Sequence, residues 1–303
     1  MPRSNPLVIL AVATLLLAPT PTQDGASPGH DWREDARTLE FLNARVASRH
    51  AEGDRSVAAA AWTLLSYTAR GSTMRSGRHR SHVKELTKWL RGIQIDGGKL
   101  APGKQPCQRL DQVVGTLALA EVTLLSHYTL LKPTVSNASR ATLDALTDAG
   151  AAPPTAAEVA LLLVLAYTLD YGKLEHGAAC RELALAARAR LPAPKSPRDR
   201  AAHCLIALLL EEPVPKALTV QRIWPKNPMA DPLHTWLAVQ ALARTDRPTF
   251  AACAKDFEKL AAMCTPAGED RGSWPATMEF DAVTATAALA AALGLAACDP
   301  LGK

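Results

Sequence analysis

Aromatic residues are scarce in this 303-residue chain: Phe, Trp and Tyr make up 5% of it, whereas hydrophobic residues as a whole make up 48%. A sizeable core must therefore be built mainly from Ala, Leu and Val, which suit closely packed helices. The sequence also lacks strand-like alternation of polar and apolar residues between turn signals. These two absences predict an all-α protein.

Charge of one sign is not concentrated either. The formal net charge of +5 is spread over the chain, apart from a short basic stretch between Arg75 and Lys84. A nucleic-acid-binding protein would show a basic stripe with interleaved aromatic residues or a known motif, and neither is present. We therefore expect no nucleic-acid partner and interpret the basic stretch as a solvated loop and helix start. Binding of an anion or a membrane surface is the alternative.

An apolar run near the N-terminus is too short to span a membrane comfortably. It covers the twelve residues 7–18 and follows Arg3, whereas a membrane-spanning helix needs about 20 apolar residues. This arrangement is typical of a secretory signal peptide. We interpret residues 1–26 as a signal peptide cleaved near Ala26, and an uncleaved N-terminal anchor as the alternative. The predicted location is periplasmic or secreted, with the membrane involved only through such an anchor.

The six cysteines do not indicate a disulfide framework, although an exported protein can form disulfides. Cys253 and Cys264 are expected on one helix, eleven residues apart, which separates them by about 16 Å and puts them beyond the reach of a disulfide. Cys180 and Cys204 lie in apolar helical patterns, where cysteine commonly acts as a small buried hydrophobe. We expect mostly free, buried thiols.

Pairs of helices recur along the chain, each an apolar segment followed by an amphipathic one. The apolar segments are predicted at residues 56–69, 111–127, 155–169, 197–210, 232–243 and 281–293. Their amphipathic partners are predicted at 79–94, 136–148, 175–190, 216–223 and 249–263, and segment 33–48 precedes the first pair. A helix that is apolar all round must be surrounded, whereas a one-sided helix can face water. The two types predict an inner and an outer layer: a single α/α toroid of about five to six helix pairs over residues 27–303, with an open α-solenoid as the alternative.

Two turns between helices carry related motifs. A Trp-Leu pair that begins at Trp89 is followed by Gln94 and Gly97, and a Gly-x-Trp motif is formed by Gly272 and Trp274. The Gln amide can bond carbonyls left free at a helix end, Gly supplies the positive φ needed to leave the helix, and Trp packs across the turn.

These motifs resemble the QW-type repeat of squalene cyclases and protein prenyltransferase β-subunits. The first copy departs from that repeat with Lys99 in place of an aromatic residue, and the second copy has no Gln at the matching place. Segment 231–274 is also similar to exported bacterial prenyltransferase/squalene-oxidase repeat proteins. The resemblance implies an α/α toroid and implies no particular reaction.

The catalytic motifs of the enzymes with this repeat are missing from the sequence. It contains neither the Asp-x-Asp-Asp motif of class II terpenoid cyclases, nor the Asp-x-Cys zinc pair of protein prenyltransferases, nor the Gly-Cys-Gly-Glu-Gln thioester of complement-type toroids. The pairs His176/Cys180 and His79/His82 each offer only two metal ligands, fewer than a zinc site needs. We expect no metal and no cofactor.

The face where the apolar helices begin is the candidate site. If these helices run parallel, their positive N-terminal dipoles converge on one face, which would form the mouth of the ring. Acidic residues at the helix starts have an ordinary interpretation as caps, and the tryptophans as packing residues or, alternatively, a sugar-stacking platform. The functional interpretation is an acidic mouth for a polar or cationic ligand. Its candidate residues are Asp111, His127, Asp231, His234, Trp236, Arg271, Trp274, Glu279 and Asp281.

The sequence therefore favours a non-catalytic exported repeat protein that acts as a binding or scaffold module for an unspecified small molecule or protein. The alternative is a diverged terpenoid-cyclase-like or carbohydrate-active enzyme that uses the mouth of the barrel, which would require two suitably placed acidic groups. A centre filled by Ala and Leu side chains would count against the enzyme.

Overall fold

A computed structural model describes residues 36–47, 55–104, 106–215, 218, 223–245, 250, 252–264, 273–277 and 280–297. Over these residues the secondary structure is helical and contains no strand, only an isolated bridge between Gln94 and Leu100. The prediction of an all-α protein is confirmed. The predicted signal peptide lies outside the described residues. Within them, no helix combines the length and apolar character that crossing a bilayer requires.

Six helices are buried on almost every side, and we call them the inner helices. They are α3 (Val57–Thr68), α5 (Arg109–Ser126), α7 (Ala156–Tyr171), α9 (Pro197–Leu209), α11 (Pro232–Leu242) and α14 (Ala282–Ala297). Every residue of α3 and of α11 is buried. Their ranges match the predicted apolar segments to within a few residues, because a run of Ala, Leu and Val without a polar face can be stable only where protein surrounds it.

The remaining long helices bury only one face, and we call them the outer helices. They are α2 (Ala36–Leu42), α4 (Arg80–Gly92), α6 (Lys132–Thr147), α8 (Gly177–Arg188) and α13 (Ala254–Ala262). In α4 the buried residues are Val83, Leu86, Thr87 and Leu90, which recur at the spacing of one helical face. The predicted segment 33–48 is α2 followed by a π-helical turn, Asn43–Ala47. Of the predicted segment 216–223, only residues 218 and 223 are described.

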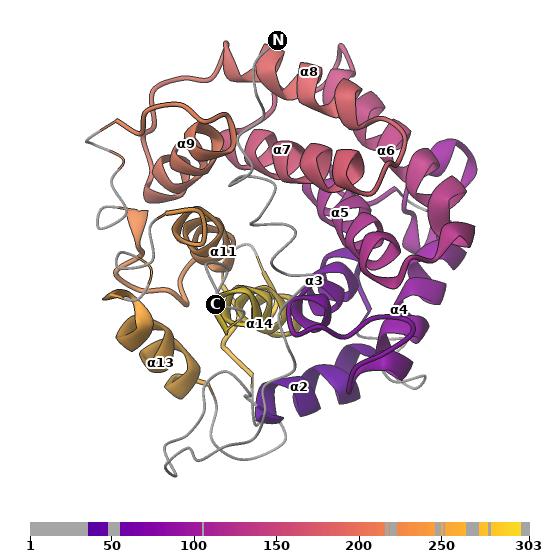
Figure 1. Cartoon of the computed structure of the whole chain (residues 1–303), viewed down its shortest axis with the longest axis horizontal. Helices are drawn as coiled ribbons and strands as arrows, with labels where there is room; N and C mark the ends of the chain where they lie inside the picture. The colour runs from indigo at the N-terminus through magenta and orange to yellow at the C-terminus, as the bar shows by residue number, and fades with distance from the viewer. Residues whose placement is uncertain are drawn as a thin grey trace.

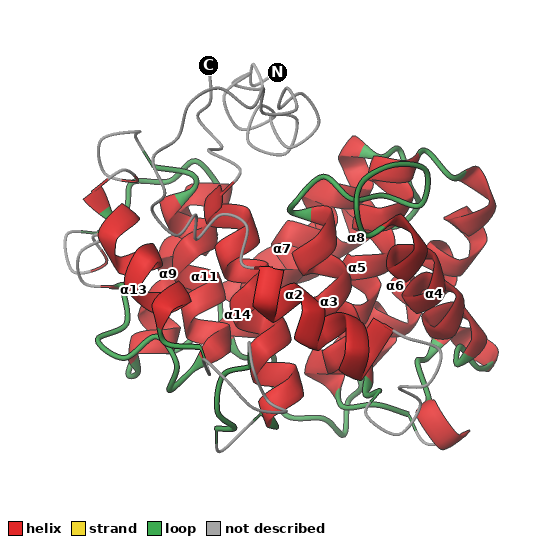
Figure 2. Ribbon diagram, turned by 90° about the horizontal axis from the view of Figure 1, so that it is seen from below, coloured by secondary structure: helices red, strands yellow, loops and turns green. Residues whose placement is uncertain are grey.

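Contacts among the inner helices follow a cyclic order. Each packs on the next in the series α3, α5, α7, α9, α11 and α14, and α14 packs on α3 (Figure 1). The outer helices pack against this inner layer from outside: α4 on α3, α6 on α5, α8 on α7 and α13 on α14. The loops lie along the two edges of the helical layer (Figure 2).

The inner helices run parallel, so the inner layer has an N-terminal end and a C-terminal end. Arg109 at the start of α5 pairs with Glu158 at the start of α7. Near the opposite ends of their helices, the Tyr167 hydroxyl of α7 donates to the Leu209 carbonyl of α9. The outer helices return the chain from the C-terminal end to the N-terminal end.

The turn after α4 shows how the chain leaves an outer helix. Gly97 and Gly98 have φ angles of 77° and 87°, a region that favours glycine. A Cβ on Gly98 would lie 2.0 Å from the Asn137 carbonyl oxygen of α6. The Gln94 Nε2 donates to the Gly98 carbonyl at 3.4 Å and to the Thr134 carbonyl at 3.0 Å. The Gln amide therefore ties the turn to α6 and not to the end of its own helix.

The tryptophans of the two turn motifs differ in burial. Trp89 is half-buried against the core, whereas Trp274 is fully buried. The Trp274 Nε1 donates to the Leu260 carbonyl of α13 at 3.3 Å, and its backbone N–H donates to Thr286 Oγ1 of α14 at 2.9 Å. Trp274 thus holds an outer helix against an inner one. Gly272 lies outside the described residues.

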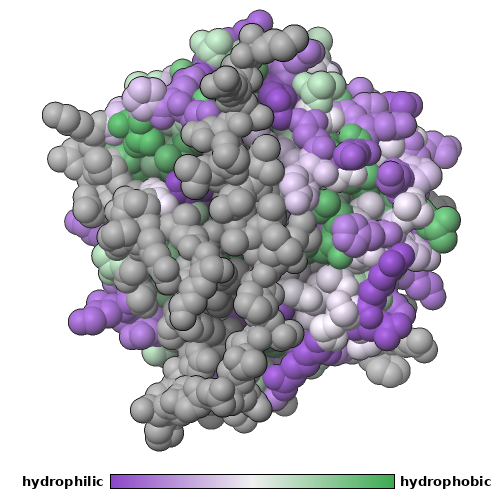
Figure 3. All heavy atoms as spheres, viewed as in Figure 1, coloured by the Kyte–Doolittle hydropathy of each residue, from purple (hydrophilic) through white to green (hydrophobic). Residues whose placement is uncertain are grey.

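The surface is mostly polar, and the apolar cysteine side chains are mostly buried. Where described residues are visible in Figure 3, hydrophilic residues predominate around the rim and hydrophobic ones form only small patches. The five described cysteines are free thiols. Cys180, Cys204 and Cys264 are buried, and Cys107 and Cys253 are half-buried.

Candidate functional site

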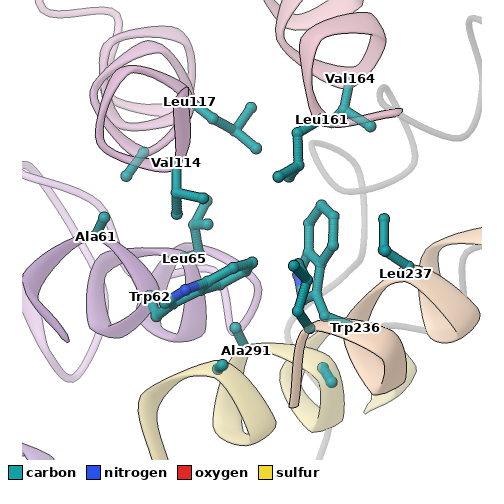
Figure 4. Close-up of a cluster of buried hydrophobic side chains, with 14 of the residues drawn as sticks. Ala61, Trp62, Leu65, Val114, Leu117, Leu161, Val164, Trp236, Leu237 and Ala291 are labelled. Carbon is teal, nitrogen blue, oxygen red and sulfur yellow. The ribbon is translucent and has the colours of Figure 1, made fainter. Parts of the chain in front are cut away.

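The middle of the inner layer is filled by side chains (Figure 4). Trp62 of α3 and Trp236 of α11 meet edge to face, with ring centroids 5.2 Å apart and an interplanar angle of 66°. Both are fully buried. Aliphatic side chains from the other helices surround them, among them Leu117, Leu161 and Ala291. We call this buried pair the tryptophan plug; Trp236 also lines the cavity at the C-terminal end that is described below.

At the N-terminal end, the acidic residues predicted as a mouth act as helix caps. The Asp231 carboxylate accepts the His234 backbone N–H at 2.9 Å and Arg198 Nε at 2.6 Å. The Asp281 carboxylate accepts the backbone N–H and the hydroxyl of Thr284 at 2.7 and 3.0 Å. These are the contacts that satisfy free N–H groups at a helix start.

Glu158 in the first turn of α7 is held by several donors. It completes a capping box with Thr155 and receives Nε and Nη2 of Arg109 at 2.6 and 2.9 Å. Such a bidentate guanidinium–carboxylate pair is a strong, oriented contact. The acidic groups at this end are thus largely occupied by the chain itself.

Asp111 differs from these caps because it has a second carboxylate nearby. Burial, together with the negative charge of Asp281, raises its pKa to about 6. The two groups lie at the starts of α5 and α14, on either side of α3. The Asp111 carboxyl group therefore retains its proton to a higher pH than an exposed aspartate does.

The other predicted mouth residues lie elsewhere. His127 caps the C-terminus of α5 in a left-handed conformation, with φ of 48°, so the length of the helix separates it from Asp111 by about 24 Å. Trp236 belongs to the central plug, and Trp274 is buried between α13 and α14. Arg271 and Glu279 lie outside the described residues.

His234 lies near the mouth, but its ring is already engaged. It is buried, and its Nε2 lies 2.7 Å from the Ile223 carbonyl oxygen. Burial lowers the pKa of the ring. His234 also lines an open surface groove of about 1070 Å³ at the N-terminal ends of α7, α9 and α11.

At the C-terminal end lies a small cavity of about 50 Å³, which we call the C-terminal cavity. Its walls come from the last turns of α3, α5, α7, α11 and α14 and are mostly apolar. The polar groups that line it are Thr68, Glu121, Thr168, Gln240 and Arg244.

Glu121 brings a carboxylate to this cavity from α5. Its Oε2 accepts the Thr68 hydroxyl at 3.0 Å. Burial raises its pKa to about 7, while the Thr68 hydrogen bond and the charge of Arg244 act in the opposite direction. At the C-terminal half of a helix an acidic group lacks the free N–H groups that stabilise the caps at the other end.

Arg244 brings a guanidinium from the end of α11. Its Nη1 donates to the carbonyl oxygen and to Oε1 of Gln240, at 2.7 and 2.6 Å. Burial lowers its pKa to about 10, against the influence of Tyr167 and Glu121. Within the described part of the chain, Arg244 and Glu121 form no ion pair with each other. Both charges face the cavity.

The sequence contained a signal for this site that the motifs did not capture. Glu121 is the one charged residue in the latter part of an otherwise apolar segment, between Ala120 and Val122. A charge at such a position must either reach solvent or be given polar partners inside the protein. Arg244 directly follows another apolar segment. That the two share a cavity depends on the arrangement of α5 and α11.

The histidine pairs weighed as metal ligands have other contacts. His79 stacks on Tyr67 with centroids 4.7 Å apart, and His82 lies 6.2 Å from the same ring. His176 Nε2 lies 3.3 Å from the Ser136 hydroxyl, whereas Cys180 is buried. Among the described residues, no group of three or more His, Cys, Asp or Glu side chains could hold a metal ion.

We compared the chain with known protein families, with curated proteins and with solved structures. The chain matches no family model, no curated protein and no solved structure.

Proposed function

We propose that this chain is an exported α/α toroid that acts as a non-catalytic binding or scaffold module. The cyclic order of contacts from α3 round to α14, with outer helices packed against the inner ones, supports a toroid over an open solenoid. The apolar run at residues 7–18 supports export. The turn built from Gln94 and Gly97 supports the likeness to prenyltransferase/squalene-oxidase repeat proteins.

The observation that carries the proposal is the filled centre. Enzymes that process isoprenoids or glycans need a cavity that takes the substrate, and sites for drug-sized ligands enclose about 300–1,000 Å³. Here the Trp62–Trp236 plug occupies the middle of the inner layer, and the C-terminal cavity measures about 50 Å³. The C-terminal cavity is therefore too small for such substrates.

A turnover assay beside a ligand screen tests this proposal. Purified protein would be incubated with prenyl diphosphates, with squalene and with oligosaccharides, and products would be followed by mass spectrometry. We expect no product with any of them, and a shift in melting temperature with at least one compound of the screen. Reproducible turnover that disappears in Asp111→Asn but persists in Asp144→Asn, a matched change at an exposed site on α6, would overturn it.

A second function, hydrolysis of a glycan at the N-terminal end, is favoured by one observation. Asp111 has a pKa of about 6 next to Asp281, and a raised carboxyl pKa beside a second carboxylate is what a glycosidase acid requires. Its test is oligosaccharide cleavage by wild type, Asp111→Asn and Asp281→Asn. Loss of cleavage in both variants would support the enzyme, and absence of cleavage in the wild type would remove it.

Export has a separate test. We expect the mature protein to lack residues up to about Ala26, which N-terminal sequencing of protein recovered outside the cytoplasm would reveal. Recovery of the intact chain from the membrane fraction would support the anchored alternative instead.

A further inference from the structure

We propose that the C-terminal cavity binds a small free α-amino acid, of about the size of glycine or alanine, as its zwitterion. The ligand carboxylate would pair with Arg244 and its ammonium group with Glu121. This inference deepens the proposed binding function and rests on it, because it names the site and the class of ligand.

The first argument is the placement of the two charges. In the cyclic order of the inner helices, α5 and α11 are three positions apart, so they lie on opposite sides of the inner layer (Figure 1). Glu121 and Arg244 therefore reach the cavity from opposite walls, and among the described residues they do not form an ion pair with each other. A ligand with a positive and a negative end can bridge them.

The second argument is the hydrogen-bonding capacity that the protein leaves free. Thr68 donates to one carboxylate oxygen of Glu121, and no described residue donates to the other. Gln240 accepts hydrogen bonds from Nη1 of Arg244. No described residue accepts from Nε or from Nη2 of Arg244. A guanidinium presents these donors in a fork that matches a carboxylate.

The third argument is size. A buried water needs a cavity of at least about 10–15 Å³, so a cavity of about 50 Å³ holds the equivalent of about three to five waters. Glycine and alanine, with their compact backbones, fall in this range. Apolar wall residues such as Leu65, Val164 and Leu295 leave no polar partner for a longer polar side chain.

The fourth argument is charge balance. Above about pH 7, where Glu121 is ionised, the cavity contains one carboxylate and one guanidinium, and burying an ion of one sign there would leave the opposite protein charge without compensation. A zwitterion compensates both charges at once. An anion alone or a cation alone compensates one of them, so the site favours the amino acid over a simple carboxylate or a simple amine.

The experiment is isothermal titration calorimetry of the full-length protein at about pH 8, where Glu121 is ionised. The ligands are glycine and L-alanine, with glycolate and ethylamine as probes that carry only one of the two charges. For ligands this small we expect dissociation constants in the micromolar to millimolar range. Glycolate and ethylamine should each bind at least about tenfold more weakly than glycine.

Two variants change one charge each and predict different selectivities. Glu121→Gln should weaken glycine at least about tenfold while leaving glycolate unchanged or tighter, because only the guanidinium remains. Arg244→Gln should weaken both glycine and glycolate. The matched controls Glu182→Gln and Arg190→Gln, at exposed positions on or next to α8, should bind glycine as the wild type does. Circular dichroism verifies that each variant is folded.

Each outcome decides the proposal. Saturable binding of glycine with this change of selectivity supports it. Absence of saturable binding in folded wild-type protein, equal binding by all variants, or glycolate binding as tightly as glycine in the wild type would overturn it. Turnover in the assays above would contradict the non-catalytic function without affecting the glycine-binding result. Failure of the proposed function and failure of the amino-acid site are therefore distinguishable.

Discussion

The two ends of the inner layer handle charge in opposite ways. At the N-terminal end, Asp231, Asp281 and Glu158 are taken up by backbone N–H groups and by arginines. At the C-terminal end, Glu121 and Arg244 each have one side-chain partner and otherwise face a cavity. The difference follows from helix geometry, because free N–H groups and a positive dipole are available only at helix starts. Acidic residues at the N-terminal end are therefore ordinary helix caps, whereas the Glu121 carboxylate at the C-terminal end has no capping role.

The largest effect is expected from removing half of the tryptophan plug, which fills the middle of the inner layer between the two ends. Trp236→Ala should lower the free energy of unfolding by about 3–5 kcal/mol, because a fully buried tryptophan is lost and a cavity remains. Chemical denaturation measures this. Trp89→Ala, at a half-buried position on an outer helix, should cost clearly less. Equal losses in the two variants would mean that the centre is not packed as described.

Substitutions in the turn after α4 should also destabilise the protein. Gly98→Ala should cost about 2–4 kcal/mol, because its φ is positive and the new Cβ would collide with the Asn137 carbonyl. Gly97→Ala is the matched control, since Gly97 also has a positive φ but nothing lies within 4 Å of its Cβ position. We expect the control to cost about 1 kcal/mol. A thermal or chemical denaturation series in which both variants behave alike would contradict the close approach of the turn to α6.

A pH series sharpens the contrast between the ends. The Glu121 pKa is raised from 4.5 to about 7, so the folded chain retains this proton at pH values where the unfolded chain has lost it. The free energy of unfolding should therefore fall as pH rises through this window, by about 2–3 kcal/mol. The groups that act on Glu121 are Thr68 of α3 and Arg244 at the end of α11.

In Glu121→Gln, most of this decrease in the free energy of unfolding with rising pH should disappear. Asp111→Asn should remove a further fall in stability between about pH 4 and 6, since the Asp111 pKa is raised from 3.8 to about 6. Unfolding by urea at a series of pH values measures both. A wild-type stability that stayed constant or rose between about pH 4.5 and 7 would contradict the burial of Glu121.

The smallest effect is expected from a single cap at the N-terminal end. Asp231→Ala should cost about 1 kcal/mol, because the His234 N–H loses its acceptor. Asp231→Asn keeps an acceptor oxygen and loses only the charge near Arg198, so it should cost about 0.5 kcal/mol or less. If the two variants lost the same stability, the Arg198 ion pair would be the main role of Asp231.

The helices could be predicted from the sequence because their signals are short-range. The segments predicted at 56–69, 155–169 and 232–243 are α3, α7 and α11, which begin and end within one or two residues of those limits. Apolar periodicity sets the burial of each helix, and residues such as Thr155 and Asp231 mark its start. The capping interpretation of the acidic helix starts follows from the same local rules.

What the sequence determined by itself was the all-α class, the alternation of fully buried and one-sided helices, and the caps at the helix starts. Tertiary structure alone decided which ends of which helices meet: that Trp62 packs on Trp236, that His127 lies far from Asp111, and that Glu121 shares a cavity with Arg244. The reason is physical. Helix formation and capping involve residues within a few positions of one another, whereas a cavity arises where side chains from distant helices fail to fill the space between them.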